Sequence, residues 1–305
     1  MTDEVAPAVS VVIPSFRGGP LLREAIASVQ AQTLQEWEAI VVLDGCEDDL
    51  SDIESSDGRV RVLRQRNRGA STARNAGIGQ ARAALVALLD DDDRMLPGRL
   101  LAQRDVMADP AVGACHTQFR VIDESGAVIG AGGSKESQYV DFLRGDGAIL
   151  VSSMMVRRTL IHEAGGFNPL YPLGEDLDFA YRIAREAPLR FLPEVHAEYR
   201  VHGSNTWAGS SKGGALIKLT LRQHLYAAEA RGESANVRAI RRGLSLIPSD
   251  RVGAVMQRAK RARERNDRAA MLGALGEAFL LSPAFTLRAV VREVRRGSGP
   301  GRGVS

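Results

Sequence analysis

The N-terminal third of the chain alternates between short apolar runs and segments in which apolar residues recur every three or four positions. Short runs rich in Val, Ile and Leu predict buried strands, and the three-to-four spacing predicts amphipathic helices. The predicted strands cover 9–13, 38–43, 59–64 and 83–89, and the predicted helices begin at Pro20 and cover 69–82. Because strands alternate with helices, we expect an α/β fold with a mostly parallel sheet.

Turn-forming residues make the middle of the chain less regular. The pattern predicts a hairpin over 112–129 around Glu124-Ser125-Gly126, a strand over 148–156, a helix over 174–187 and short strands over 189–192 and 197–201. From residue 212 the spacing is helical as far as 296, and a Gly-rich tail follows. We therefore expect an α/β domain over 1–211, a helical region over 212–296 and a disordered tail over 297–305.

The α/β part and the helical part of the chain differ clearly in net charge. The 305 residues are 44% hydrophobic and 25% charged, an ordinary globular composition that excludes a fully disordered chain. Residues 212–305 hold 19 Lys and Arg against 7 Asp and Glu, whereas the first 211 residues hold 21 against 30. A basic region of this kind attracts anions such as lipid headgroups or nucleic acid, or it is simply a solvated helical surface.

The sequence also indicates a cellular setting. Two cysteines provide no disulfide framework, the N-terminus lacks the basic-then-apolar pattern of a signal peptide, and no run of about 18 apolar residues occurs. We therefore expect a cytoplasmic protein. The basic amphipathic segment 285–294 can lie on the inner face of a membrane or pack on the first domain, and its sequence favours neither location over the other.

Acidic residues follow two of the predicted strands. Asp44 ends the second strand, and Asp90-Asp91-Asp92-Asp93 follows the fourth. Ligands of parallel α/β sheets bind beyond the carboxyl ends of the strands, so both groups are expected at one crevice. Adjacent carboxylates repel unless a cation neutralises them, and Mg²⁺ or Mn²⁺ on a diphosphate suits this role. The alternative is an acidic loop that caps the next helix.

Three further residues have both a chemical and a structural interpretation. Asp176, next to Glu175 at a predicted helix start, is a candidate general base or a helix cap. His202 is a candidate ligand or a structural hydrogen-bonding group, and Arg74 binds a phosphate or pairs with a surface carboxylate.

The sequence lacks a phosphate-binding loop, a dinucleotide fingerprint after the first strand and a nucleophile elbow, which argues against those enzyme classes.

The order of these motifs resembles family 2 of the glycosyltransferases. The resemblance covers about residues 9–205, and Leu43 stands where the family has a first aspartate. The motifs that carry it are Val-Ser-Val-Val-Ile-Pro-Ser-Phe (9–16), the helix 22–33, Ile-Val-Val-Leu-Asp-Gly (40–45), Gly-Ala-Ser-Thr-Ala-Arg-Asn-Ala-Gly (69–77), Leu-Leu-Asp-Asp-Asp-Asp (88–93), Gly-Gly-Phe (165–167), Gly-Glu-Asp (174–176) and Tyr-Arg-Val-His (199–202).

This resemblance implies a GT-A fold, a Rossmann-like sheet flanked by helices, followed here by a helical extension. It also implies inverting transfer of a sugar from a nucleotide-diphosphate donor, a UDP-sugar, to a hydroxyl of a carbohydrate, glycolipid or small-molecule acceptor. The product would be a cell-surface polysaccharide or glycoconjugate, and no nucleic-acid partner is expected. The alternatives are a nucleotidyltransferase and a non-catalytic nucleotide-sugar-binding protein.

The resemblance also assigns roles to individual residues. Asp176 would be the catalytic base, and Asp92 and His202 would bind Mn²⁺ or Mg²⁺. The residues expected to bind the nucleotide sugar are Pro14, Ser15, Phe16, Asp44, Arg74, Asp90, Asp91 and Glu175.

Overall fold

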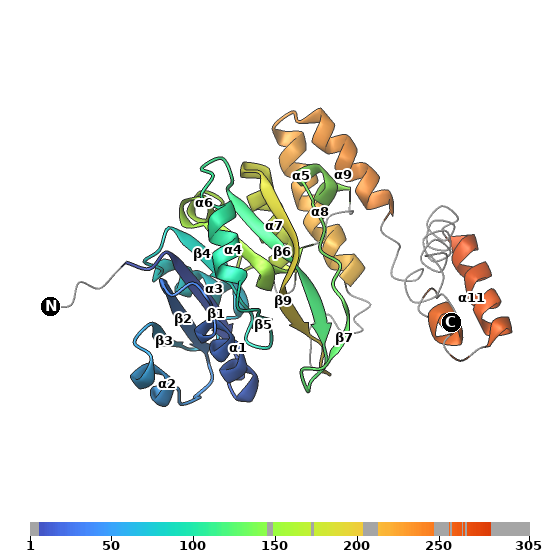
Figure 1. Ribbon diagram of the computed structural model, residues 1–305. Helices are drawn as coiled ribbons and strands as arrows, with labels where there is room; N and C mark the ends of the chain where they lie inside the picture. Colours follow the sequence, from blue (N-terminus) through green and yellow to red (C-terminus); the bar gives the residue numbers. More distant parts are fainter. Residues whose placement is uncertain are drawn as a thin grey trace, which may run out of the picture. The chain divides into compact units, whose positions relative to one another are not determined.

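The computed structural model divides the chain into two compact units, residues 1–208 and 209–305 (Figure 1). It describes residues 6–144, 149–171, 174–203, 213–246, 256, 258–263, 265 and 267–281. The first unit is a mixed sheet of nine strands with helices on both faces, and the second unit is helical in its described residues.

The sheet has the strand order β3-β2-β1-β4-β8-β6-β9-β5, with β7 paired to β6. Strands β3, β2, β1 and β4 run parallel, β8 is antiparallel to both of its neighbours, and β9 runs parallel to β6. The strands are β1 Val9–Ser15, β2 Trp37–Asp44, β3 Val60–Gln65, β4 Leu85–Leu88, β5 Arg94–Met95, β6 Ala114–Ile122, β7 Val128–Ala131, β8 Met154–Arg157 and β9 Leu189–Arg200.

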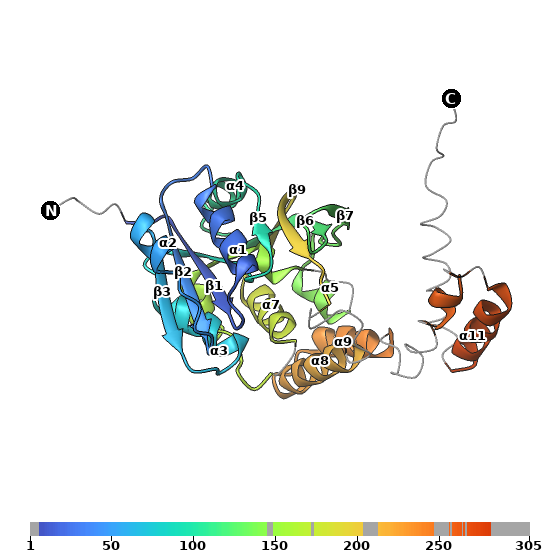
Figure 2. The same cartoon turned by 90° about the horizontal axis from the view of Figure 1, so that it is seen from below.

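Helices cover both faces of this sheet, and Figure 2 shows α1 and α4 on one face and α3 and α7 on the other. The helices of the first unit are α1 Pro20–Gln30, α2 Ser51–Ser56, α3 Ala70–Gly79, α4 Arg99–Val106, α5 Tyr139–Leu143, α6 Arg158–Glu163 and α7 Glu175–Glu186. Alternate residues of β1, β2 and β4 form one apolar core with α1 and α4, because successive side chains of a strand point to opposite faces.

The structure confirms the predicted alternation of strands and helices and the hairpin around Glu124. Two predictions are wrong. Residues 151–153 form a 3₁₀ turn, and the strand begins only at Met154. Arg99 donates to the backbone carbonyl of Ser152, in this turn, and to that of Met154, at the start of the strand.

The two short strands predicted at 189–192 and 197–201 are a single strand, β9. Pro193 suggested a break in the sequence, because proline has no N–H for a ladder hydrogen bond. The pairing register with β6 shifts between Thr117 and Gln118, so the strand passes Pro193 through a bulge instead of ending there.

The described residues of the second unit are mostly helical. Helices α8 (Gly213–Ala230) and α9 (Ser234–Leu246) pack together, and α11 (Arg268–Leu281) packs on a small alanine-rich cluster around Ala259. None of the helices in the described residues is long and apolar enough to cross a membrane. The segments 285–294 and 297–305 lie outside the described residues.

Helix α3 lies unusually close to the sheet at Gly77. A Cβ atom there would come within 2.6 Å of Cγ1 of Val12 and 3.2 Å of Cγ2 of Val42. Both valines are fully buried, so neither can move aside easily. The glycine therefore sets the distance between α3 and strands β1 and β2.

We expect Gly77→Ala to destabilise the protein by about 1–3 kcal/mol, because overpacking forces the helix or the valines to shift. At Gly79, in the same helix, an added Cβ atom would meet no other atom within 4 Å. Gly79→Ala is therefore the matched control and should be neutral or stabilising by up to about 1 kcal/mol. Chemical denaturation of both variants tests this, and equal stabilities would refute the close-contact explanation.

Candidate functional site

All eleven residues selected from the sequence line one cavity of about 920 Å³ in the first unit. They are Pro14, Ser15, Phe16, Asp44, Arg74, Asp90, Asp91, Asp92, Glu175, Asp176 and His202. They come from the ends of β1, β2, β4 and β9 and from helices α3 and α7. The expected convergence of Asp44 with the aspartate cluster is thus observed.

Asp44 organises the loop between β3 and α3. Its Oδ1 accepts hydrogen bonds from Nε2 of Gln65 and the backbone N–H of Arg68, and its Oδ2 accepts one from the N–H of Gly69, all at 2.8 Å. Gly69 adopts φ +85°, a conformation that favours glycine. The neighbouring Leu43 is fully buried in the apolar core on the other side of β2.

The end of β1 is tied to the aspartate cluster by a hydrogen bond from Ser15 Oγ to Asp91. The Ser15 hydroxyl also accepts the N–H of Gly18 at 3.1 Å, which fixes the loop before α1. Burial raises the pKa of Asp91 to about 6. Phe16, in contrast, is 56% exposed and lies at the border of the cavity.

Arg74 joins three segments that are distant in the sequence. From α3, its buried guanidinium donates to Asp90 at 2.6 Å and to Glu175 at 3.0 Å. Burial disfavours its charge, but these two carboxylates outweigh that effect and raise the pKa of Arg74. The guanidinium also lies 5.1 Å from the ring centre of Phe167.

The next residue, Asn75, fastens the Gly-Gly-Phe motif to the same helix. Its Nδ2 donates to the carbonyl of Phe167 at 2.7 Å, and its Oδ1 accepts the N–H of Phe167 at 2.8 Å. A paired contact of this kind fixes both position and orientation. The Arg-Asn and Gly-Gly-Phe motifs therefore form one connected wall beside the cavity.

The four consecutive aspartates have different environments. Asp90, Asp91 and Asp92 line the cavity, whereas Asp93 is 1% exposed and accepts the backbone N–H of Arg200 at 2.9 Å. The alternative that the cluster caps the next helix is wrong, because the first turn of α4 contains no acidic residue.

Asp92 and His202 are the residues that could hold a metal ion. Nε2 of His202 lies 2.9 Å from Oδ2 of Asp92, and burial together with the charge of Asp90 raises the pKa of Asp92. Within the described part of the chain, no group of three or more His, Cys, Asp or Glu gathers to enclose an ion. One carboxylate and one imidazole fit an ion whose remaining ligands are phosphate oxygens and water.

Asp176 lies in the first turn of α7, beside Glu175, and its Oδ1 accepts the N–H of Leu177 at 2.8 Å. Burial and the charge of Glu175 raise its pKa to about 6. A carboxylate of this kind is ionised at neutral pH but is a stronger base than an exposed aspartate. It can therefore accept a proton from a substrate.

Sequence reasoning missed three polar residues of the cavity wall, Arg17, Asn67 and Glu124. Arg17 directly follows the selected segment 14–16. Asn67 lies in the loop that Asp44 holds, and Glu124 lies in the turn of the β6–β7 hairpin. The hairpin itself was predicted, but a turn residue carries no sequence signal that places it over a distant site.

Comparison with known proteins identifies relatives of this chain. The family model described as Glycosyl transferase family 2 matches residues 10–163. An uncharacterized glycosyltransferase of Rickettsia felis is 28% identical over 219 residues, 68% of this chain and 36% of the relative. Chondroitin synthase of Pasteurella multocida is 23% identical over 208 residues, 66% of this chain and 21% of the relative. The chain spans about a third of the first curated relatives it matches.

Solved structures share the fold. Residues 1–349 of S. aureus TarS in complex with UDP-GlcNAc superpose with a TM-score of 0.62 at 17% identity, covering 91% of this chain and 82% of the TarS chain. The same segment in complex with UDP gives a TM-score of 0.57 at 14% identity, covering 97% and 94%. The predicted GT-A architecture with helices after the sheet is confirmed.

We expect Arg74→Met to destabilise the protein by about 2 kcal/mol at pH 7.5, because Asp90 and Glu175 lose the cation between them. Arg104→Met removes an exposed pair with Asp105 and should change stability by at most about 0.5 kcal/mol. Chemical denaturation of both variants at pH 7.5 tests this, and equal losses of stability in the two variants would contradict the explanation from the buried pairs.

Proposed function

The chain belongs to glycosyl transferase family 2, and from this premise we propose that it transfers a sugar from a UDP-sugar to an acceptor hydroxyl with inversion. The observation that carries the proposal is that Asp44, Asp92 and Asp176 open into one cavity. The fold it shares with TarS, which was solved with UDP-GlcNAc and with UDP, supports the choice of donor.

The acceptor in this proposal is a carbohydrate, a glycolipid or a small molecule. Relatives named chondroitin synthase and hyaluronan synthase support a role in polysaccharide or glycoconjugate synthesis. Both match this chain over 66% of its length.

The donor would lie along the wall formed by β1, β2 and α3. Asp44 would accept a hydrogen bond from the uracil, and the segment 14–16 would border the nucleotide. Both terminal nitrogens of Arg74 already hold carboxylates, so its main role would be to orient Asp90 and Glu175 toward the donor. Asp91 would act together with Ser15, to which it is hydrogen-bonded.

Asp92 and His202 would hold Mn²⁺ or Mg²⁺ together with the donor diphosphate. When bound, the ion would neutralise the charge that develops on the leaving diphosphate. The raised pKa of Asp92 supports this assignment, because burial and then the neighbouring charge of Asp90 disfavour its negative charge, which a bound cation would compensate.

Asp176 would act as the general base. An acceptor hydroxyl is a weak nucleophile at neutral pH, so the Asp176 carboxylate would take its proton as the oxygen bonds to the anomeric carbon. The bond to the diphosphate breaks from the opposite side, which inverts the configuration without a covalent enzyme intermediate. Glu175, held by Arg74, would keep the start of α7 in place.

Product analysis tests the reaction class. With a panel of UDP-sugars, Mn²⁺ and candidate acceptors, we expect release of UDP without pyrophosphate. Asp92→Asn should lower the rate at least about 100-fold, whereas Asp105→Asn, an exposed carboxylate in another ion pair, should not. Pyrophosphate release would indicate a nucleotidyltransferase, and UDP binding without any turnover would indicate a binding protein.

The pH dependence of the rate tests the base. The values of kcat/KM should fall about tenfold per pH unit below pH 6 and level off above pH 7, because only ionised Asp176 accepts the proton. Asp176→Asn should lower kcat by about 10²–10⁴ and leave UDP affinity within about twofold. Glu186→Gln, at the other end of α7, is the matched control. A wild-type rate in Asp176→Asn would exclude this role.

We also propose that the second unit makes peripheral contact with anionic membranes through its basic helices. Helix α9 buries Ala239 and Ile240, while Arg238, Arg241 and Arg242 are exposed. Exposed arginines on one helix attract anionic headgroups, each by about 1 kcal/mol near the surface.

Flotation with vesicles tests this contact. The protein should float with vesicles of phosphatidylcholine and phosphatidylserine but not with phosphatidylcholine alone. Replacing Arg238 and Arg242 by Gln should weaken binding at least about tenfold. The matched control replaces Arg66 and Arg144, two exposed arginines of the first unit. Equal flotation with both vesicle types would refute an electrostatic contact.

A further inference from the structure

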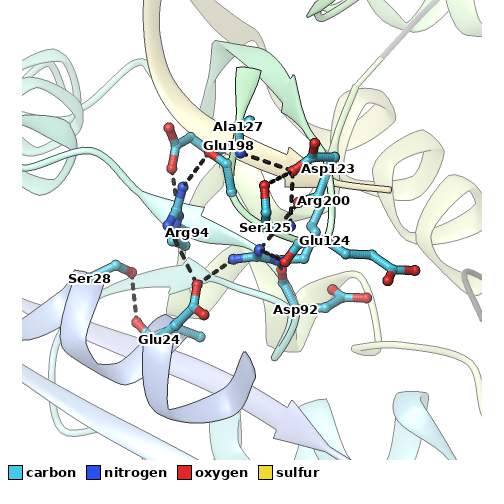
Figure 3. Close-up of polar contacts among 12 residues, drawn as sticks. Glu24, Ser28, Asp92, Arg94, Asp123, Glu124, Ser125, Ala127, Glu198 and Arg200 are labelled. Carbon is cyan, nitrogen blue, oxygen red and sulfur yellow. Dashed lines mark hydrogen bonds and ion pairs between the residues drawn. The ribbon is translucent and has the colours of Figure 1, made fainter. Parts of the chain in front are cut away.

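A buried arginine outside the cavity wall connects three parts of the site. Arg200 ends β9 and is 1% exposed. Its Nε donates to the backbone carbonyl of Asp92 at 2.9 Å. Another nitrogen reaches the carbonyls of Asp123 at 3.3 Å and Glu124 at 2.9 Å, in the β6–β7 turn (Figure 3). The third donates to the Glu24 carboxylate of α1 at 2.5 Å.

The turn that Arg200 holds is itself well ordered by hydrogen bonds. The Asp123 carboxylate accepts the N–H groups of Ser125 and Ala127 at 2.9 and 3.0 Å, as well as the Ser125 hydroxyl. Figure 3 shows these contacts next to the Arg200 guanidinium. The turn is therefore a compact unit whose position depends on what it is attached to.

Glu124 is the residue of this turn that faces the cavity. Its Oε1 accepts the N–H of Gly203 at 3.2 Å, directly after His202. An exposed carboxylate beside the Asp92–His202 pair would repel a phosphate, but it accepts hydrogen bonds from sugar hydroxyls. Its place in the cavity therefore suits the sugar rather than the diphosphate.

A second arginine, which is partly exposed, also binds the β6–β7 turn. Arg94 donates to Glu198 at 2.7 Å, to Glu24 at 3.4 Å and to the carbonyl of Gly126 at 3.3 Å. Glu24 thus bridges two arginines that both reach the turn (Figure 3). Because Glu24 does not line the cavity, it can be altered without touching the site.

We propose that Arg200 is a positioning residue for sugar transfer, which holds the Asp92 backbone and the Glu124 turn in a fixed relation so that Glu124 binds sugar hydroxyls. The role rests on the proposed function, since it concerns the same cavity. It requires arginine, because one planar guanidinium carries five N–H donors in a fixed fork and the compact ammonium of lysine cannot reach all these acceptors at once.

The test compares Arg200→Lys with Glu24→Gln and with a matched control. Glu24→Gln keeps the shape of a half-exposed side chain and removes the charge that Arg200 pairs with. The control Asp52→Asn makes the same chemical change in the exposed pair with Arg23, the neighbour of Glu24 on α1. Each variant is measured for kcat, for donor KM, for the half-saturating Mn²⁺ concentration and for amide hydrogen exchange.

For Arg200→Lys we expect kcat at least about tenfold lower and half-saturating Mn²⁺ at least about fivefold higher. Amides of the turn 123–127 and of Gly203 should exchange at least about tenfold faster, while those of β1 stay unchanged. Glu24→Gln should shift each quantity in the same direction by a smaller factor, and Asp52→Asn should match the wild type. Glu124→Gln should raise donor or acceptor KM and leave half-saturating Mn²⁺ within about twofold.

Three results would overturn the positioning role, two of which concern how the variant loses activity and how its amides exchange. One is activity lost only in proportion to unfolded protein, with unchanged KM and Mn²⁺ dependence. The other is unchanged exchange in the turn, which needs no turnover to measure and so also decides the role in an inactive enzyme. If the wild-type protein neither binds UDP nor releases it from a donor, the proposed function fails on its own. If the wild type is active and Arg200→Lys equals it, only the positioning role fails.

Discussion

The cavity depends on the buried guanidinium of Arg74, which holds together two carboxylates from distant parts of the first unit. Asp90 follows β4 and Glu175 opens α7, and each accepts a hydrogen bond from a different nitrogen of Arg74. Bringing acidic side chains together costs electrostatic energy unless a cation lies among them. The carboxylates that line the cavity are Asp44, Asp90, Asp91, Asp92, Glu124, Glu175 and Asp176. Gly77 follows Arg74 in α3 and lies close against Val12 and Val42, so the packing beneath the site supports the helix that carries Arg74.

Arg74 and Arg17 line the cavity, and these two arginines do not neutralise its seven carboxylates. The remaining imbalance would have a chemical use in the proposed function. Burial raises the pKa of Asp91 and of Asp176 to about 6, and it raises that of Asp92 as well. A site with uncompensated negative charge repels a free diphosphate but attracts a diphosphate that carries a divalent cation. The same desolvation makes Asp176 a better proton acceptor than an exposed aspartate. In the proposed function, metal binding by Asp92 and proton acceptance by Asp176 would therefore have a common origin in burial.

The sequence predicts the part of the site that depends on strand ends. Asp44 and Asp90 follow apolar runs, and parallel strands present their carboxyl ends at one edge, so their meeting needs no further information. The family motifs add Asp176 and His202, which periodicity alone does not connect to that edge. Contacts between distant loops are not predicted from the sequence. Glu124 approaches the cavity only because β7 folds back on β6 and Arg200 binds the turn. Pro193 suggested a strand end that the structure does not have, because the long partner strand β6 pairs with β9 on both sides of it.

Arg74 and Arg200 are both buried but differ in what they bind, and this difference explains why the role of only one of them can be predicted from the sequence. Arg74 binds side-chain carboxylates, so its partners belong to motifs that also line the cavity. Arg200 mostly binds backbone carbonyls, and every residue has a backbone carbonyl. The residue types of its partners therefore do not indicate its role in the sequence. Backbone contacts fix where a segment lies and leave its side chains free to vary. In the proposed function, the metal and proton chemistry would stay with Asp92, His202 and Asp176 while the turn beside Arg200 changes to accept different sugars.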